Sequence, residues 1–338
     1  MWWFQAEEKF DERPWSRRVA DRFDTEHHEL LITPEMFLKS LPEVLSRQDD
    51  PVADLAVRPL FHVCRLASES VKVLLSGQGA DEMLGGYHFD RVLKQIGAIR
   101  RLRSMPGARR LAALIGSRDP KRRYLLRWDD LKSSEPGQLP GKMRYDLTAP
   151  LSSELMERII KSPIPPPYDR TLDAFYTEVP SHRGPLDAIL GTLMKGWLPD
   201  NLLSHSDRMS MAHSVEMRVP FLDSRLVKFC FELPEALKIR RGVTKYLLKR
   251  YAVGRGLPPS LAYRRKRGFP VPWDQWIRGP LANPVREILE ASSWMEPYIN
   301  RGAVTDIFRE HEQGASHGVL LWNLVVLAHW GQRMGLSA

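Results

Sequence analysis

The feature that most constrains the fold is an apolar run that leads straight into a glycine-rich turn followed by two acids. Residues 71–75 read as a strand, and residues 76–79 turn the backbone before Asp81 and Glu82. In an open parallel sheet, ligands bind beyond the carboxyl ends of the strands. Backbone N–H groups in such a turn bind anions, and a neighbouring carboxylate can hold Mg²⁺. The segment therefore predicts an anion site with a magnesium ligand or, as the alternative, a purely structural turn.

Two more short apolar runs come earlier in the chain and are separated by helical patterns. Residues 2–5 and 28–32 are strand candidates, and residues 59–68 are predicted to form a helix before the third strand. Helices between strands imply crossover connections and a parallel sheet. Further along the chain strand-like runs disappear. We expect an α/β fold, with an incomplete nucleotide-binding part with a partial parallel sheet in residues 1–90 and a mainly helical remainder of the same domain in residues 91–338.

Two later segments combine charged residues with apolar neighbours. Glu216 and Arg218 stand among apolar residues in segment 207–223, so we expect both to be buried and paired, either at a site or in a structural ion-pair network. Lys245 stands at the start of a predicted helix, where the helix dipole disfavours a cation. A phosphate ligand would explain this position, and an exposed lysine without a ligand is the alternative.

These three segments together resemble the synthetase domain of the class II asparagine synthetase family. The chain reads Leu-Ser-Gly-Gln-Gly-Ala-Asp-Glu-Met-Leu-Gly-Gly-Tyr at 75–87 and Ser-Met-Ala-His-Ser-Val-Glu-Met-Arg-Val-Pro-Phe-Leu-Asp at 210–223. It continues with Lys-Tyr-Leu-Leu from 245 and Lys-Arg-Gly-Phe from 266, matching the family in order and spacing. Residues 10–12, 25–29, 49–51 and 321–322 fit as well. The resemblance implies the adenine-nucleotide α-hydrolase type of α/β fold.

The resemblance also implies a reaction. Members of this family use ATP to activate the side-chain carboxylate of aspartate as a β-aspartyl-adenylate, and ammonia then displaces AMP to give asparagine. Negative charge accumulates on the phosphates, so Mg²⁺ and a lysine are natural stabilisers. The implied ATP-binding residues are Ser76, Gly77 and Gly79, with Asp81 as the magnesium ligand. Lys245 and Gln78 take the catalytic positions. The implied substrate pocket contains Gly85, Gly86, Tyr87, Glu216 and Arg218.

Two departures from the family pattern concern the acceptor substrate. Gln78 stands where many members have Glu or Asp, and an amide cannot act as a base or hold a full negative charge. Ala56 stands where a Ser or Thr is often found. A related amidotransferase or cyclase that acts on another carboxylate is therefore an alternative to asparagine synthesis.

Other departures are absences. The family's glutaminase nucleophile is a cysteine after the initiator methionine, whereas residue 2 here is Trp2. The family's pyrophosphate loop, Ser-Gly-Gly-x-Asp-Ser, occurs nowhere in the chain. We therefore expect a synthetase domain truncated upstream of Trp2 and incompetent alone. A separate chain that supplies the loop or the glutaminase is one possible partner, and a non-catalytic remnant or interaction subunit is the third alternative.

Charge and apolar runs bear on the remaining classes of function. The net charge is +9, and residues 91–127 carry twelve Lys or Arg against the single acid Asp119. No aromatic residues interleave with these cations before Tyr124, so we expect a solvated helical segment and no specific nucleic-acid binding. The most apolar run, 319–330, falls short of the ~20 residues of a membrane span. Cys64 and Cys230 read as buried thiols of a reducing compartment, so we expect a cytoplasmic protein.

Overall fold

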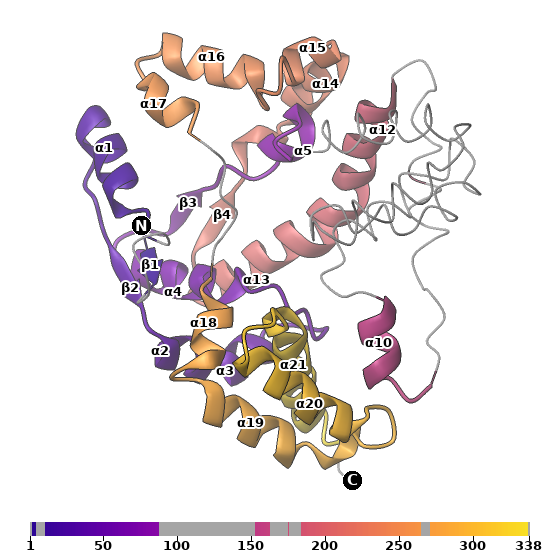
Figure 1. Ribbon diagram of the computed structural model, residues 1–338. Coiled ribbons are helices and arrows are strands. Elements are labelled where there is room, and N and C mark those ends of the chain that lie inside the picture. The colour runs from indigo at the N-terminus through magenta and orange to yellow at the C-terminus, as the bar shows by residue number, and fades with distance from the viewer. Residues whose placement is uncertain are drawn as a thin grey trace, which may run out of the picture.

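The computed structural model describes residues 2–4, 11–87, 153–162, 175, 184–264 and 271–336. Four short strands form two parallel pairs (Figure 1). β1 (Trp2–Phe4) pairs with β2 (Leu30–Ile32), and β3 (Val73–Leu75) pairs with β4 (Glu216–Arg218). The predicted α/β class with a small parallel sheet is confirmed, and three of the four strands lie where the apolar runs predict them.

Helices connect the strands in the first part of the chain, as parallel pairing requires. α1 (Arg13–Phe23) follows β1 and precedes β2. Between β2 and β3 come α2 (Pro34–Lys39), α3 (Leu41–Ser46) and α4 (Val57–Ser68). The helix predicted at residues 59–68 is therefore present and begins two residues earlier.

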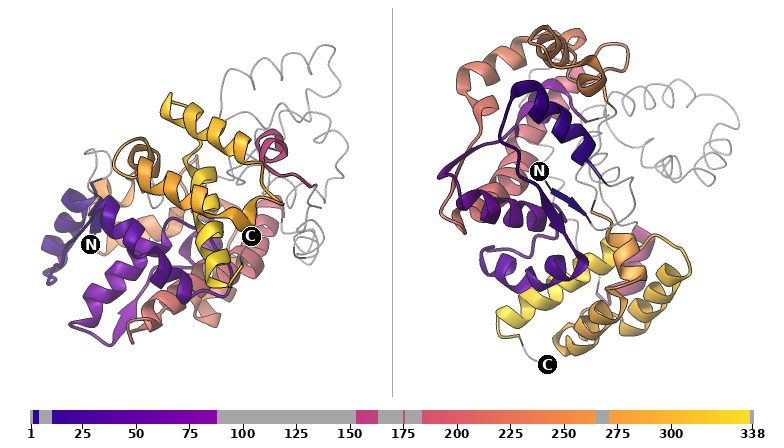
Figure 2. Two further views of the ribbon diagram at one scale, coloured as in Figure 1. Left: turned by 90° about the horizontal axis from the view of Figure 1, so that it is seen from below. Right: turned by 90° about the vertical axis from the view of Figure 1, so that its left-hand side faces the viewer.

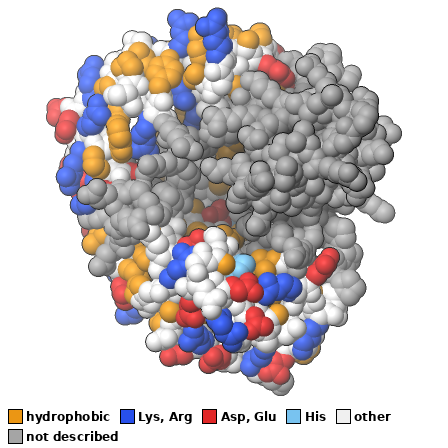
Figure 3. All heavy atoms as spheres, in the orientation of Figure 1, with side chains coloured by type: hydrophobic (Ala, Val, Ile, Leu, Met, Phe, Trp, Pro, Cys, Tyr) orange, Lys and Arg blue, Asp and Glu red, His pale blue; other side chains and the backbone are white. Residues whose placement is uncertain are grey.

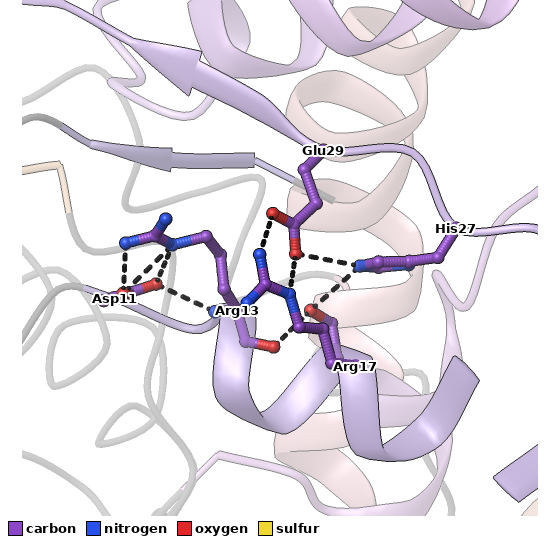
Figure 4. A network of polar contacts seen from close by, with 6 residues as sticks. Asp11, Arg13, Arg17, His27 and Glu29 are labelled. Atoms are coloured by element: carbon purple, nitrogen blue, oxygen red, sulfur yellow. Dashed lines mark hydrogen bonds and ion pairs between the residues drawn. The ribbon is translucent and has the colours of Figure 1, made fainter. Parts of the chain in front are cut away.

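A polar network fixes α1 against the segment that enters β2 (Figure 4). Arg17 donates to both carboxylate oxygens of Glu29, with N–O distances of 2.7 and 2.6 Å. His27 Nε2 lies 3.3 Å from Glu29 Oε1. At the start of the helix, Arg13 pairs with Asp11 at 2.7 Å. The charged residues of this part of the chain thus hold a crossover helix to the edge of the sheet.

Beyond β3 the described chain is helical except for β4. The helices are α5 (Ala80–Leu84), α10 (Ser153–Ile159), α12 (Gly184–Thr192), the π-helix η4 (Leu193–Leu203), α13 (Ser204–Met211), the 3₁₀ turn η5 (Pro220–Leu222), α14 (Ser224–Glu232), α15 (Glu235–Lys238), α16 (Tyr246–Gly254), α17 (Pro259–Ala262), α18 (Trp273–Arg278), α19 (Ala282–Ala291), the 3₁₀ turn η6 (Ser293–Met295), α20 (Arg301–Glu312) and α21 (Gly318–Arg333).

β4 corrects the expectation that strands end with the first part of the chain. Its sequence is Glu-Met-Arg, which has no apolar run, so periodicity alone could not identify it. The strand exists because β3 offers a parallel edge, and such pairing overrides weak local preference.

Two groups of helices lie at opposite ends of the strands (Figures 1 and 2). One group holds α5 and α14–α17, and the other holds α2, α3 and α18–α21. The second group contains the largest core, in which Phe37 contacts three tryptophans, Trp273, Trp276 and Trp322. The rings of Trp273 and Trp322 meet edge to face with centroids 4.5 Å apart. Within the described residues, no helix combines the length and apolar character that a membrane span requires.

Candidate active site

The turn after β3 is held in place by backbone pairing and by close packing. The N–H of Ser76 donates to the carbonyl of Arg218 at 2.8 Å, which extends the β3–β4 ladder into the turn. Gly79 has φ 92° and lies so close to Leu222 that a Cβ would be 2.3 Å from its Cδ2. Around Gly77, by contrast, nothing lies within 4 Å of where a Cβ would be. The turn is therefore packed on one side and open at Gly77, as an anion-binding turn requires.

Gly86 allows Asp81 to take its position. A Cβ on Gly86 would lie 1.5 Å from Asp81 Oδ1 and 2.8 Å from Asp81 Cβ, so any side chain would displace the carboxylate. The N–H of Gly86 also donates to the backbone carbonyl of Asp81 at 2.9 Å. The Gly-Gly pair that follows α5 thus folds back over the carboxylate that precedes it.

Asp81 and Lys245 meet in an ion pair although they are far apart in the sequence. Lys245 Nζ lies 2.9 Å from Asp81 Oδ1, and the two side chains are 23% and 27% exposed. Lys245 directly precedes α16 with a left-handed backbone, φ 50°. The predicted lysine at a helix start and the predicted carboxylate after β3 therefore lie together, partly open to solvent.

A second lysine lies next to this pair. Lys249 follows Lys245 by one helical turn, and its N–H donates to the Lys245 carbonyl at 2.9 Å. Burial lowers the pKa of Lys249, and the positive charge of Lys245 lowers it further, whereas Asp81 acts in the opposite direction. Sequence reasoning did not single out Lys249. Its i+4 spacing from Lys245, which puts both on one helix face, was the signal that could have found it.

Gln78 is anchored by its amide nitrogen. Nε2 donates to Ser206 Oγ and, at 3.4 Å, to the carbonyl of Leu202 at the end of the π-helix η4. Oε1 is buried and has no hydrogen-bond partner among the described residues. Gln78 therefore has a buried acceptor oxygen without a partner among the described residues, and its side chain carries no charge. Ser206 and Leu202 are contacts that the sequence gave no reason to expect.

Tyr87 turns inward from the end of the Gly-Gly segment. Its hydroxyl donates to Glu82 Oε1 at 2.6 Å, and Glu82 is buried. Burial and the negative charge of Glu82 raise the pKa of Tyr87. Tyr87 also packs against the apolar cluster of α12, including Leu190. Its hydroxyl is thus a neutral donor that fixes the second acid of the motif.

The expected burial of Glu216 and Arg218 is wrong. Both lie on β4 with side chains 59% and 60% exposed, and they pair with each other at 2.9 Å. The expectation failed because the alternating strand turns both side chains to the same face, while Met217 between them points to the other. The pairing itself is present.

Of the two acids in the motif, Asp81 is partly exposed, whereas Glu82 is buried and bonded to Tyr87. No group of three or more His, Cys, Asp or Glu with the geometry of a metal site occurs among the described residues. Protein-bound Mg²⁺ commonly takes only one or two carboxylates and completes its shell with phosphates and water. A single carboxylate therefore fits an ion that arrives with a nucleotide, with Lys245 as its neighbour. Residues 265–270, which include the Lys-Arg-Gly-Phe segment, lie outside the described residues, as does the basic segment 91–127.

Comparison with known proteins identifies the family. The family model described as asparagine synthase matches residues 3–332. Glutamine-hydrolyzing asparagine synthetase 1 of Bacillus subtilis is 29% identical over 324 residues, which are 95% of this chain and 50% of that protein. Asparagine synthetase 3 of the same organism is 28% identical over 260 residues, 77% of this chain and 36% of that protein. The chain thus spans half or less of the length of these relatives. Because the family model covers nearly the whole chain, the chain belongs to the asparagine synthase family.

Proposed function

We propose that this chain carries the ATP-dependent half of an asparagine synthetase. In the reaction, the side-chain carboxylate of aspartate displaces pyrophosphate from the α-phosphorus of ATP to give a β-aspartyl-adenylate, and ammonia then displaces AMP to form asparagine. The ion pair between Asp81 and Lys245 at the carboxyl end of β3 carries this proposal. It supports the proposal because a carboxylate suited to Mg²⁺ and a cation suited to a phosphate lie together near a glycine turn suited to an anion.

The proposed roles of the site residues follow from their charges. The backbone N–H groups of Gly77 and Gly79 contact the nucleotide, because those of Ser76 and Gln78 already donate within the protein, and the open space at Gly77 admits it. Lys245 neutralises the charge that grows on the phosphates as the bond to the carboxylate forms, because a fixed cation in a partly dry site costs no reorganisation. When bound, Mg²⁺ would be held by Asp81 and would withdraw charge from the phosphate oxygens. Lys249, one turn from Lys245, adds positive potential.

We propose that competence needs a further strand and its loop. β1 and β3 each pair with one neighbour, and no pairing between them occurs among the described residues. Leu75, at the end of β3, is 75% exposed, which is unusual for leucine in a parallel strand. A strand between β1 and β3 would pair with the second edge of β3 and bring side chains next to Leu75, and the turn after it would supply the pyrophosphate loop. A preceding segment or a separate chain can provide both.

The proposal also concerns which carboxylate is the acceptor substrate. Gln78 is neutral, its Nε2 donates to Ser206 and Leu202, and its buried Oε1 has no partner among the described residues, so the side chain has no charge and no spare donor for an acceptor substrate. This favours, as the alternative function, a related amidotransferase or cyclase that acts on another carboxylate. A panel of carboxylates in the assay below separates the two.

The test is ATP–pyrophosphate exchange, which reports the adenylate step alone. The 338-residue chain is measured alone and fused to the strand–loop segment that precedes the matching region in a relative. We expect weak exchange alone and aspartate-dependent exchange after fusion. Strong exchange by the chain alone would refute the need for the segment. Exchange with another carboxylate but not with aspartate would reassign the substrate. If the folded fusion binds no ATP, the chain is a non-catalytic remnant.

Partners and location follow from the same chemistry. The small-molecule partners proposed are ATP, aspartate and ammonia, with no membrane partner. Two buried free thiols, Cys64 and Cys230, and the need for ATP suit the cytoplasm. We propose no specific nucleic-acid partner. Binding retained at about 0.2 M salt would refute this, because counterion release weakens non-specific contacts steeply with salt.

A further inference from the structure

A cavity of about 360 Å³ lies between α19 and α20, away from the Asp81–Lys245 pair. Its walls are one face of each helix. α19 contributes Arg286 and Leu289 at i and i+3, and α20 contributes Arg301, Thr305 and Phe308 at i, i+4 and i+7. The volume lies within the range of pockets that bind small organic molecules. The two helices therefore leave a space that their own side chains do not fill.

The floor of the cavity is apolar. Leu289, Met295, Ile299, Val304 and Phe308 line it, and all five belong to or pack against the core of the C-terminal helices. Such a lining binds hydrocarbon and offers few polar groups to orient a ligand. The ligand's tail is therefore aliphatic or aromatic.

The rim is cationic, with three arginines against two glutamates. In Figure 3, Lys and Arg side chains alternate with Asp and Glu over the lower part of the molecule, where α19 and α20 lie. Two rim arginines are already engaged. Arg286 pairs with Glu312 at 2.8 Å and stacks on Phe308, and Arg309 pairs with Asp306 at 2.8 Å. Neither needs a further anion.

Arg301 differs from these two. Its Nη1 lies 3.2 Å from Glu296 Oε1 and its side chain is 41% exposed, whereas the Nη2 atom is shielded from solvent and has no hydrogen-bond partner among the described residues. A buried donor without an acceptor is costly, and a charged donor more so. A carboxylate in the cavity would accept from this nitrogen in a charge-assisted hydrogen bond once the partly exposed guanidinium rotates to turn it toward the cavity.

We propose that this cavity is a binding site for a small carboxylate with an apolar tail. The tail occupies the floor beside Phe308, and the carboxylate accepts from Arg301. The site is separate from the proposed adenylation site, so it does not depend on the reaction. A ligand there bridges α19 and α20 and stabilises the C-terminal helices by mass action.

The test compares three probes of equal chain length, octanoate, octanol and octylamine, by titration calorimetry with the 338-residue chain. We expect octanoate to bind with a dissociation constant of about 1 mM or tighter. Octanol should bind at least about tenfold more weakly, since it lacks the charged acceptor, and octylamine should not bind detectably. Equal binding of octanoate and octanol, or no binding of octanoate, would overturn the proposal.

Variants locate the site. Arg301→Met should remove the preference for octanoate over octanol, and Arg301→Lys should retain part of it. Arg309→Met is the matched control, because Arg309 is on the same rim but already paired, and it should keep the full preference. Thr305→Trp, at an exposed rim position, should block all binding. Circular dichroism spectra identical to the parent's establish that each variant folds. Retained preference in a folded Arg301→Met would refute the role of Arg301.

Discussion

Replacing Lys245 by alanine separates the two contributions that this side chain can make. In the free protein, Lys245 forms an ion pair with Asp81 at 2.9 Å, with about a quarter of each side chain exposed. An ion pair that open to solvent contributes about 0–1 kcal/mol to stability. In the adenylation step the same cation faces the charge that grows on the phosphates, and losing such a group commonly costs about 3 kcal/mol of transition-state stabilisation.

The two contributions predict very different measurements. A loss of about 1 kcal/mol of stability corresponds to a fall of only about 2–4 °C in the midpoint of thermal unfolding. A loss of about 3 kcal/mol in the barrier corresponds to an exchange rate about 10²-fold slower. Lys245→Ala should therefore leave the melting temperature nearly unchanged and reduce ATP–pyrophosphate exchange strongly.

The assay uses the chain fused to its strand–loop segment, with thermal unfolding measured on the same samples. Arg250→Ala is the matched control, because Arg250 is on the same helix and contacts the ring of Tyr246. It removes one positive charge without touching Asp81, so exchange should stay within about threefold of the parent. If Lys245→Ala exchanges at the parental rate, the lysine is not in the site. If Arg250→Ala falls as far, only net charge matters and the reasoning from the ion pair is refuted.

Three further predictions follow from other contacts. Asp81→Asn should raise the Mg²⁺ concentration needed for exchange, because the amide keeps the shape and loses the charge; superimposable Mg²⁺ titrations would contradict this. Lys238 and Asp187 form a fully buried pair at 2.6 Å, so Asp187→Asn should cost about 3–5 kcal/mol in urea unfolding, whereas Asp187→Leu combined with Lys238→Met should cost less. Burial lowers the pKa of His205 below 6.5, so the unfolded chain takes up a proton at this residue at a higher pH than the folded protein does. Stability is therefore fully present above pH 6.5 and is lost as the pH falls from 6.5 toward the pKa of the folded state. Unfolding free energy should therefore drop between pH 7.5 and 5 and drop less in His205→Gln; equal slopes for the two proteins would exclude His205 as a source.

The sequence predicted the strands that have apolar runs and missed the one that has none. Residues 71–75 are apolar except for Lys72 and end in a glycine turn, so β3 was predictable from local pattern. β4 reads Glu-Met-Arg and forms only because Val73 to Leu75 offer it an edge. Local periodicity holds no information about a partner so far along the chain.

In the candidate site, too, local features were predictable from the sequence and tertiary contacts were not. The glycine turn and Asp81 are visible in one short segment, but the meeting of Asp81 with Lys245 follows from tertiary packing and was reached through the family resemblance. Lys249 was overlooked because an isolated lysine on a helix is usually exposed. The burial of Glu216 and Arg218 was misjudged because apolar neighbours in sequence point to the opposite face of a strand.

The pairing of β3 with β4 has a consequence for how the chain folds. Val73 and Glu216 are register partners although about 140 residues separate them. Closing a loop of that length costs roughly 4 kcal/mol of chain entropy before any ladder bond compensates. During synthesis, β3 leaves the ribosome long before β4 exists, and at about 5–20 residues per second the wait is about 7–30 seconds. We expect this ladder to form late, with refolding limited by the closure of one long loop rather than by the helices.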